Sequence, residues 1–138
     1  MRSIVFILLL AVGIVGSARK HTPMQADNLN GTWLPVKQEF GGMSIPPGAF
    51  AKQSLVISDS TYTFTAESVD KGVSKYAGGK MDIYGKEGVN TGKHFMALYK
   101  LENDQLTICY NLNGDVYPET FDTKGKPKYF MSVFKRAK

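Results

Sequence analysis

Residues 97–110 read ALYKLENDQLTICY, and this stretch decides the fold. Apolar and polar side chains alternate on both sides of Asn103-Asp104, a pair that favours a tight turn. A two-residue turn at this place pairs Leu101 with Leu106, and alternate residues then share one face. The pattern therefore predicts a β-hairpin with an apolar face. That face carries Phe95, Ala97, Tyr99, Leu101, Leu106, Ile108, Tyr110 and Leu112.

Two further hairpins are predicted upstream, with turns at Asp59-Ser60 and Gly78-Gly79. Both flanks of each turn are rich in β-branched and aromatic residues, as strands are. The second turn also places Lys75 opposite Asp82, as an exposed cross-strand contact of small energy. The two registers pair Ile57 with Tyr62, Leu55 with Phe64, and Tyr76 with Met81.

Further strands are expected at residues 32–40, 116–121 and 129–135, which brings the total to eight or nine. An open sheet of that size would leave an apolar edge and an uncovered face. The predicted fold class is therefore all-β, a single antiparallel up-and-down barrel of about eight strands. A two-sheet sandwich is the competing architecture. Only residues 46–52 resemble a helix, and they are too short for more than one or two turns.

Composition agrees with one globular domain. The 138 residues are 43% hydrophobic, 12% aromatic and 21% charged, which excludes disorder, collagen and coiled coil. A single cysteine, Cys109, allows no internal disulfide and no thiolate metal cluster. The net charge of +5 comes from lysines scattered through the chain, apart from a group near its end. Since no nucleic-acid motif accompanies that charge, we expect no nucleic-acid partner.

The first 18 residues have the order of a secretory signal peptide. Arg2 supplies the positive charge, residues 4–15 form an apolar run with glycine, and Gly16-Ser17-Ala18 supplies small residues for cleavage. The apolar run is too short to favour a spanning helix, although retention as an anchor is the alternative. We therefore expect residues 1–18 to be removed, export to the periplasm or outside the cell, and no stable membrane insertion afterwards. Residues 19–28 are predicted to be a flexible lead-in to a domain at residues 29–138.

A family resemblance covers essentially the whole predicted domain. The opening Leu29-Asn30-Gly31-Thr32-Trp33 resembles the Gly-x-Trp start of lipocalin-type barrels. Further stretches are similar to a lipocalin-like domain of unknown function that recurs in planctomycete proteins. They are residues 81–83, 97–110, 118–121 and 135–136. Tyr117 stands where that family usually has arginine, and two motifs of true lipocalins are not visible, so no transport role is carried over.

The resemblance also implies how one end of the barrel is closed. In lipocalin barrels a late arginine often packs over the tryptophan of the first strand. Here those residues would be Arg136 and Trp33, as a structural cation–π contact. A ligand contact made by Arg136 is the less favoured alternative.

The sequence offers little for catalysis. His21 falls in the predicted lead-in, and the predicted register places Cys109 opposite Leu98. His94 then lies four residues along the neighbouring strand from Leu98, about 13 Å from Cys109 and too far for a thiol–imidazole pair. Cys109 is expected to be a small buried residue. We therefore expect no catalytic residues and no enzyme activity.

Metal and cofactor sites are not expected either. No acidic cluster has calcium-loop spacing, and no glycine-rich loop precedes a helix long enough to bind phosphate. The aspartates are instead interpreted as turn formers. These are Asp59, Asp70, Asp104, Asp115 and Asp122.

Aromatic residues carry the functional prediction. Several fall on faces assigned to the interior, where they either fill a solid core or surround a lumen. The first hypothesis is an exported lipocalin-like binding protein for a small apolar or aromatic molecule. The alternative is a non-catalytic structural or protein-interaction module with a solid core, and the volume of the interior distinguishes the two. The candidate lumen residues are Tyr62, Tyr76, Tyr99, Tyr110 and Phe121.

Overall fold

A computed structural model describes residues 27–138 of the chain. The predicted signal peptide, His21 and most of the predicted lead-in lie outside these residues. The described part contains nine strands and one short 3-10 helix. They are β1 (Gly31–Phe40), β2 (Met43–Ser44), η1 (Pro47–Ala49), β3 (Ser54–Ser58), β4 (Thr61–Thr65), β5 (Val69–Ala77), β6 (Lys80–Glu87), β7 (His94–Glu102), β8 (Gln105–Asn111) and β9 (Tyr129–Arg136).

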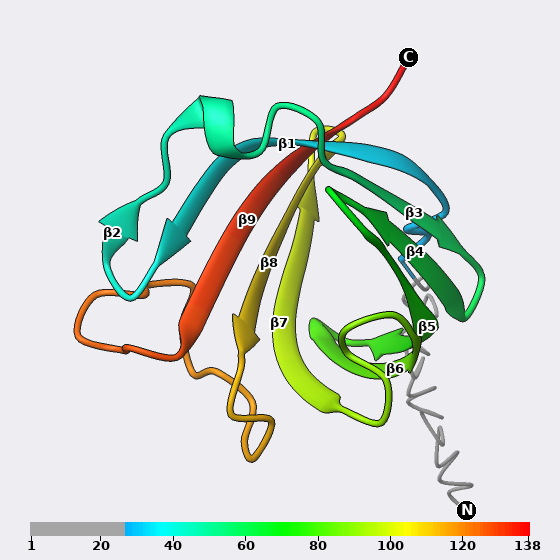
Figure 1. The fold of residues 1–138 in the computed structure, drawn as a ribbon. Coiled ribbons are helices and arrows are strands. Elements are labelled where there is room, and N and C mark those ends of the chain that lie inside the picture. Colours follow the sequence, from blue (N-terminus) through cyan, green and yellow to red (C-terminus); the bar gives the residue numbers. More distant parts are fainter. Residues whose placement is uncertain (1–26) are drawn as a thin grey trace, which may run out of the picture.

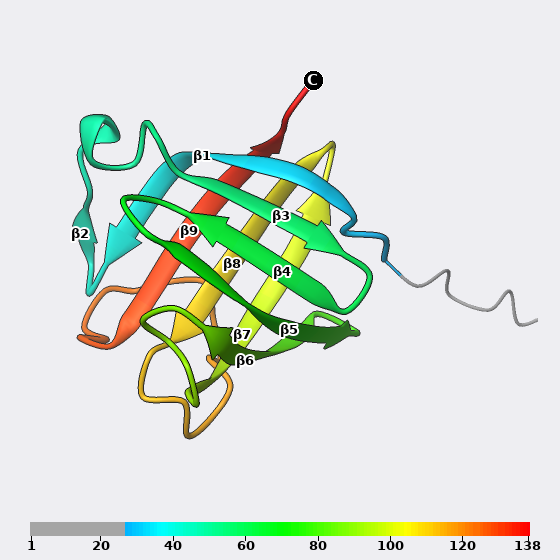
Figure 2. The same cartoon turned by 45° about the vertical axis from the view of Figure 1, so that its right-hand side comes forward.

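The strands form one antiparallel sheet that closes on itself (Figure 1). β1 and β3 to β9 pair in sequence order, and β9 returns to pair with β1 from Trp33↔Arg136 to Phe40↔Phe130. Figure 2 shows these strands wrapping around a common interior. Closure satisfies the backbone donors and acceptors that an open sheet would leave at its edges. The predicted eight-stranded up-and-down barrel is therefore confirmed, with β2 as an extra short strand beside β1.

The three predicted hairpins have the predicted registers. Ile57 pairs with Tyr62, Tyr76 with Met81 and Leu101 with Leu106. Both turn residues of the second and third hairpins have positive φ, at Gly78-Gly79 and Asn103-Asp104. Such turns match the right-handed twist of the flanking strands, so turn chemistry decides which side chains face inward.

One sequence-based expectation about the chain after β8 is wrong. Residues 116–121 are not a strand: Pro118 has no N–H to donate to a ladder, and β8 pairs directly with β9. The short helical turn predicted near residues 46–52 is confirmed as η1, which spans Pro47–Ala49. Among residues 27–138 there is no helix with the length and apolar character that crossing a bilayer needs.

The segment between β8 and β9 covers part of the outer surface. Thr123 is almost fully buried, and its hydroxyl accepts a hydrogen bond from the backbone N–H of Gly42 at 3.0 Å. Asn111 donates to the side chain of Asp115 and to the backbone of Val116. Cys109, which faces out of the barrel, is nevertheless fully buried, as predicted. This burial raises the pKa of the Cys109 thiol to about 11, so the thiol stays protonated at neutral pH.

Candidate functional site

The two ends of the barrel differ in how completely they are filled. We call the end near the three hairpin turns the closed end, defined by Leu29, Trp33, Tyr76, Tyr99 and Arg136. The opposite end, where β5 and β7 begin, contains a cavity, and we call it the open end.

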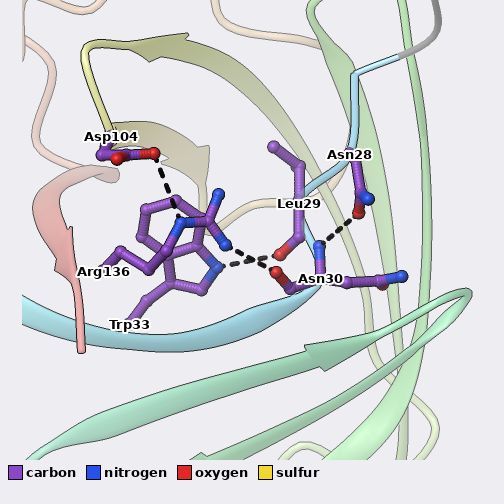
Figure 3. A network of polar contacts seen from close by, with 6 residues as sticks. All are labelled: Asn28, Leu29, Asn30, Trp33, Asp104 and Arg136. Carbon is purple, nitrogen blue, oxygen red and sulfur yellow. Dashed lines mark hydrogen bonds and ion pairs between the residues drawn. The ribbon is translucent and has the colours of Figure 1, made fainter. Parts of the chain in front are cut away.

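Trp33 is the centre of the closed end. Its side chain is fully buried, and the indole N–H donates to the carbonyl of Leu29 at 2.9 Å (Figure 3). The guanidinium of Arg136 lies over the indole, with its carbon 4.3 Å from the ring centroid. Arg136 also donates to the carbonyl of Asn30 at 2.7 Å and to the carboxylate of Asp104 at 3.4 Å. The structure thus brings together the two residues that the sequence assigned to closure.

Gly31 explains why glycine precedes the tryptophan at this spacing. Its φ is +138°, a conformation that L side chains rarely adopt. A Cβ at this position would also lie 2.8 Å from a terminal nitrogen of Arg136. Glycine therefore lets the chain pass directly beneath the guanidinium.

Tyr76 and Tyr99 belong to the closed end as well. Their rings meet edge to face, with centroids 5.7 Å apart. The hydroxyl of Tyr76 accepts from the backbone N–H of Leu29 at 3.4 Å, and the hydroxyl of Tyr99 donates to Asp27 at 3.1 Å. Both candidate lumen residues thus point their hydroxyls toward the first described residues, and neither lines the cavity.

The open end holds a cavity of about 160 Å³. Its deeper wall is formed by almost fully buried side chains, whereas Leu112 at its rim is 38% exposed. Tyr62 and Tyr110, two of the candidate lumen residues, line it. The rest of the apolar lining comes from Leu55, Ile57, Phe64, Met81, Ile83, Phe95, Ile108, Leu112 and Phe130.

One wall of the cavity is polar. The inward face of β5 carries Asp70, Gly72 and Ser74, whose inward direction follows from their register with β4 and β6. Asp70 is only 7% exposed and Ser74 only 2%, and both line the cavity. Gly72 admits no side chain, because a Cβ there would lie 2.8 Å from the ring of Tyr62. The prediction that Asp70 is a turn former is wrong, because Asp70 lies within β5, opposite Phe64.

The carboxylate of Asp70 is only partly engaged. One oxygen accepts from the side-chain amide of Asn90 at 2.8 Å and from the hydroxyl of Tyr62 at 3.3 Å. Burial, and then the neighbouring Asp70 carboxylate, raises the pKa of Tyr62 well above its usual value, so Tyr62 remains a donor. The other Asp70 oxygen and the hydroxyl of Ser74 have no hydrogen-bond partner within residues 27–138. Buried polar atoms are rarely left so.

The loop between β6 and β7 delivers Asn90 to the cavity. Gly85 and Gly92 join the two sides of this loop through a backbone hydrogen bond of 3.0 Å. A Cβ on Gly85 would lie 1.8 Å from the carbonyl oxygen of Asn90, so only glycine permits this approach. The polar wall of the cavity is therefore built from the consecutive strands β4 and β5 together with the 88–93 loop.

The remaining candidate residues lie away from the cavity. Phe121, a candidate lumen residue, lies in the β8–β9 segment, where the ammonium of Lys100 is 4.9 Å from its ring centroid. His94 binds the carboxylate of Asp82 at 2.7 Å and stacks on Tyr84.

The same carboxylate also accepts a hydrogen bond from Tyr117. Asp82 faces Lys75 in the register as predicted, yet its hydrogen bonds go to His94 and Tyr117. Cys109 lies opposite Leu98, in the predicted register.

Sequence reasoning missed Asp70, Ser74 and Asn90. Residues 70, 72 and 74 alternate along β5 and therefore share one face. The sequence could have shown this only if residues 69–77 had first been predicted to be one strand. The position of Asn90 had no signal of its own, since it depends on how the loop folds back. The contact between Asp82 and His94 could have been predicted by pairing β6 with β7. In that register Tyr84 lies opposite His94, and Asp82 is its diagonal neighbour.

Chemically, the open end can hold a small molecule between apolar walls and a polar strand. Within the described residues no group of three or more His, Cys, Asp or Glu side chains could hold a metal ion. No family model, no curated protein and no solved structure matches this chain. The function is therefore inferred from the cavity and its lining.

Proposed function

We propose that the chain is an exported, non-catalytic binding protein that takes a small apolar or aromatic molecule into the cavity at the open end. The observation that carries this proposal is the cavity of about 160 Å³ inside an otherwise packed barrel. Packed interiors leave few voids larger than a water molecule. An engineered apolar cavity of about 150 Å³ binds benzene, so a molecule with one ring is of suitable size.

The lining supports an apolar ligand body. Five aromatic rings and several aliphatic side chains surround the space, and covering apolar ligand surface contributes about 25 cal/mol per Å². A preformed cavity adds to affinity, because the protein loses little freedom on binding. The volume also favours the binding proposal over the alternative of an interaction module with a solid core.

We infer a non-catalytic role from where the two most reactive side chains among residues 27–138 lie. Cys109 is buried on the outer side of the barrel wall, and His94 is engaged by Asp82 on the outer face. Neither lines the cavity. A bound molecule would therefore meet hydroxyls, one amide and one carboxylate, with neither the thiol nor the imidazole beside it.

Export and family membership complete the proposal. The order of charge, apolar run and small residues in residues 1–18 supports cleavage of a signal peptide after Ala18. The Gly-x-Trp start and Arg136 support a lipocalin-like domain, in which the closed end is structural. N-terminal sequencing of protein from outside the cytoplasm should begin at Arg19, whereas a retained Met1 would contradict cleavage.

Ligand binding is tested with toluene. We expect a saturable rise in melting temperature with toluene concentration, because ligand binding to the folded state stabilises it by mass action. Ile83→Trp should fill the cavity and remove this rise. Val56→Trp, on the exposed side of β3, is the matched control and should retain it.

The result against the proposal is equally specific. A broad set of apolar and aromatic compounds that gives no saturable shift with the unchanged protein would favour the solid interaction module. Since overpacking itself costs about 1 to 3 kcal/mol, binding to Ile83→Trp is compared by calorimetry at a temperature where both variants are folded.

A further inference from the structure

We propose that the ligand of the cavity carries a protonated amine, which binds the carboxylate of Asp70 while an apolar or aromatic body fills the rest of the space. This inference rests on the proposed function, since it names the chemical class that the same cavity takes. It concerns the polar wall, which an entirely apolar ligand would leave unexplained.

The inward face of β5 is polar, unlike the rest of the cavity wall. Elsewhere the cavity is lined almost entirely by aliphatic and aromatic side chains, whereas β5 contributes Asp70 and Ser74 with only Gly72 between them. Gly72 has no side chain that could cover its neighbours. The polar side chains of β5 therefore form part of the cavity wall, although Asp70 Oδ1 and Ser74 Oγ are themselves buried.

The carboxylate of Asp70 has no cationic partner among the described residues. A buried carboxylate is stable where hydrogen bonds or an opposite charge replace its hydration. Asn90 and Tyr62 supply two donors to one oxygen, but within residues 27–138 no Lys, Arg or His lies within 4.0 Å of the carboxylate. One oxygen of Asp70 is left without a donor. A cationic group of a ligand in the cavity supplies the opposite charge that the carboxylate lacks.

Aromatic rings surround the cavity that Asp70 lines. Tyr62, Phe64, Phe95, Tyr110 and Phe130 place aromatic rings around the cavity, and ring faces attract ammonium groups. A carboxylic acid would instead meet the like charge of Asp70 at low dielectric. Metal cations are a poor fit, because no metal-binding group of three such side chains occurs among the described residues.

The carboxylate of Asp70 is already oriented in the free protein. Asn90 and Tyr62 both donate to the same oxygen of Asp70, and these two hydrogen bonds fix the orientation of the carboxylate before a ligand arrives. Ser74 lies four residues further along the same face of β5, roughly 13 Å away at about 3.3 Å per residue. Its unpartnered, buried hydroxyl thus lies further from the open end, on the same face of β5.

The experiment compares three probes that share one ring, namely benzylamine, toluene and benzoate, by calorimetry at neutral pH. We expect benzylamine to bind about ten-fold or more tightly than toluene, as one charge-assisted hydrogen bond predicts, and benzoate not to bind measurably. Asp70→Asn keeps the shape of the side chain and should remove the preference for benzylamine while toluene still binds. Asp82→Asn is the matched control, because that carboxylate lies on the outer face with His94.

The outcomes separate this inference from the proposed function. Equal binding of toluene and benzylamine, or an unchanged preference in Asp70→Asn, would overturn the amine inference and leave the cavity proposal standing. No binding of any probe would overturn both. If Asp70→Asn does not fold, the preference of the unchanged protein decides, together with contacts between the benzylamine methylene and the Asp70 side chain in nuclear Overhauser spectra.

Discussion

The two ends of the barrel use the same residue types for different purposes. At the closed end, the hydroxyls of Tyr76 and Tyr99 are bonded, and Arg136 covers Trp33. At the open end, equally inward side chains surround about 160 Å³ of space, and Ser74 has a hydroxyl without a partner among residues 27–138. The difference teaches that an inward tyrosine does not by itself indicate a ligand site. What distinguishes the two ends is whether the protein itself satisfies the polar atoms.

The largest expected effect comes from emptying the closed end. Trp33→Ala removes a fully buried indole and the surface on which Arg136 rests. We expect a loss of about 3 to 5 kcal/mol in the free energy of unfolding, measured by urea denaturation. Phe64→Ala at the partly exposed open end is the control and should cost less. Equal losses would contradict the view that the closed end is the better packed one.

The next effect tests the backbone beneath Arg136. Gly31→Ala places a methyl group against the guanidinium in a conformation that favours glycine, and should cost about 1 to 3 kcal/mol. Gly78→Ala is the matched control, because Gly78 also has positive φ but no atom within 4 Å of the added Cβ. Thermal denaturation of both variants measures the difference. A loss no greater than that of Gly78→Ala would mean that Arg136 moves aside at no cost.

A smaller effect, with opposite signs at the two ends, tests the polar atoms themselves. Tyr99→Phe removes a hydrogen bond to Asp27 and should cost about 1 kcal/mol. Ser74→Ala removes a buried hydroxyl without a partner and should leave stability unchanged or raise it by up to about 1 kcal/mol. Chemical denaturation gives both values. A loss in Ser74→Ala as large as that in Tyr99→Phe would mean that Ser74 is bonded in the free protein.

The smallest effect on the free energy of unfolding at neutral pH is expected for Cys109. This residue belongs to neither end of the barrel and gives a point of comparison for both. Burial raises the pKa of its thiol from 9.0 to about 11, so the unfolded chain releases this proton first. The free energy of unfolding should therefore fall as the pH rises through that interval. Cys109→Ala should remove this part of the pH dependence, while tyrosine contributions cancel between the two proteins. The same slope in both would show that the folded thiol is not shielded.

The fold was largely predictable because its signals are local. Turn residues at 59–60, 78–79 and 103–104 each act over a few positions, and each determines the register of a whole hairpin. The site was less predictable. Tyr62 and Tyr110 line the cavity, but Tyr76, Tyr99 and Phe121 do not, although all five carry similar side chains. Which end of the barrel a residue reaches depends on its position along the strand as well as on its face.

The sequence alone was enough for the all-β class and for the inward faces of the hairpins, since alternation and tight turns specify these from nearby residues. The contact between Trp33 and Arg136 was expected only from the resemblance to lipocalin-type barrels, and it joins β1 to β9. The burial of Asp70 within a strand, and the hydrogen bond that Asn90 donates to it, became clear only from the tertiary structure. The physical reason is that burial is a non-local property. Whether a polar side chain meets water, a partner or an empty space depends on segments that are distant in the chain and meet only when the barrel closes.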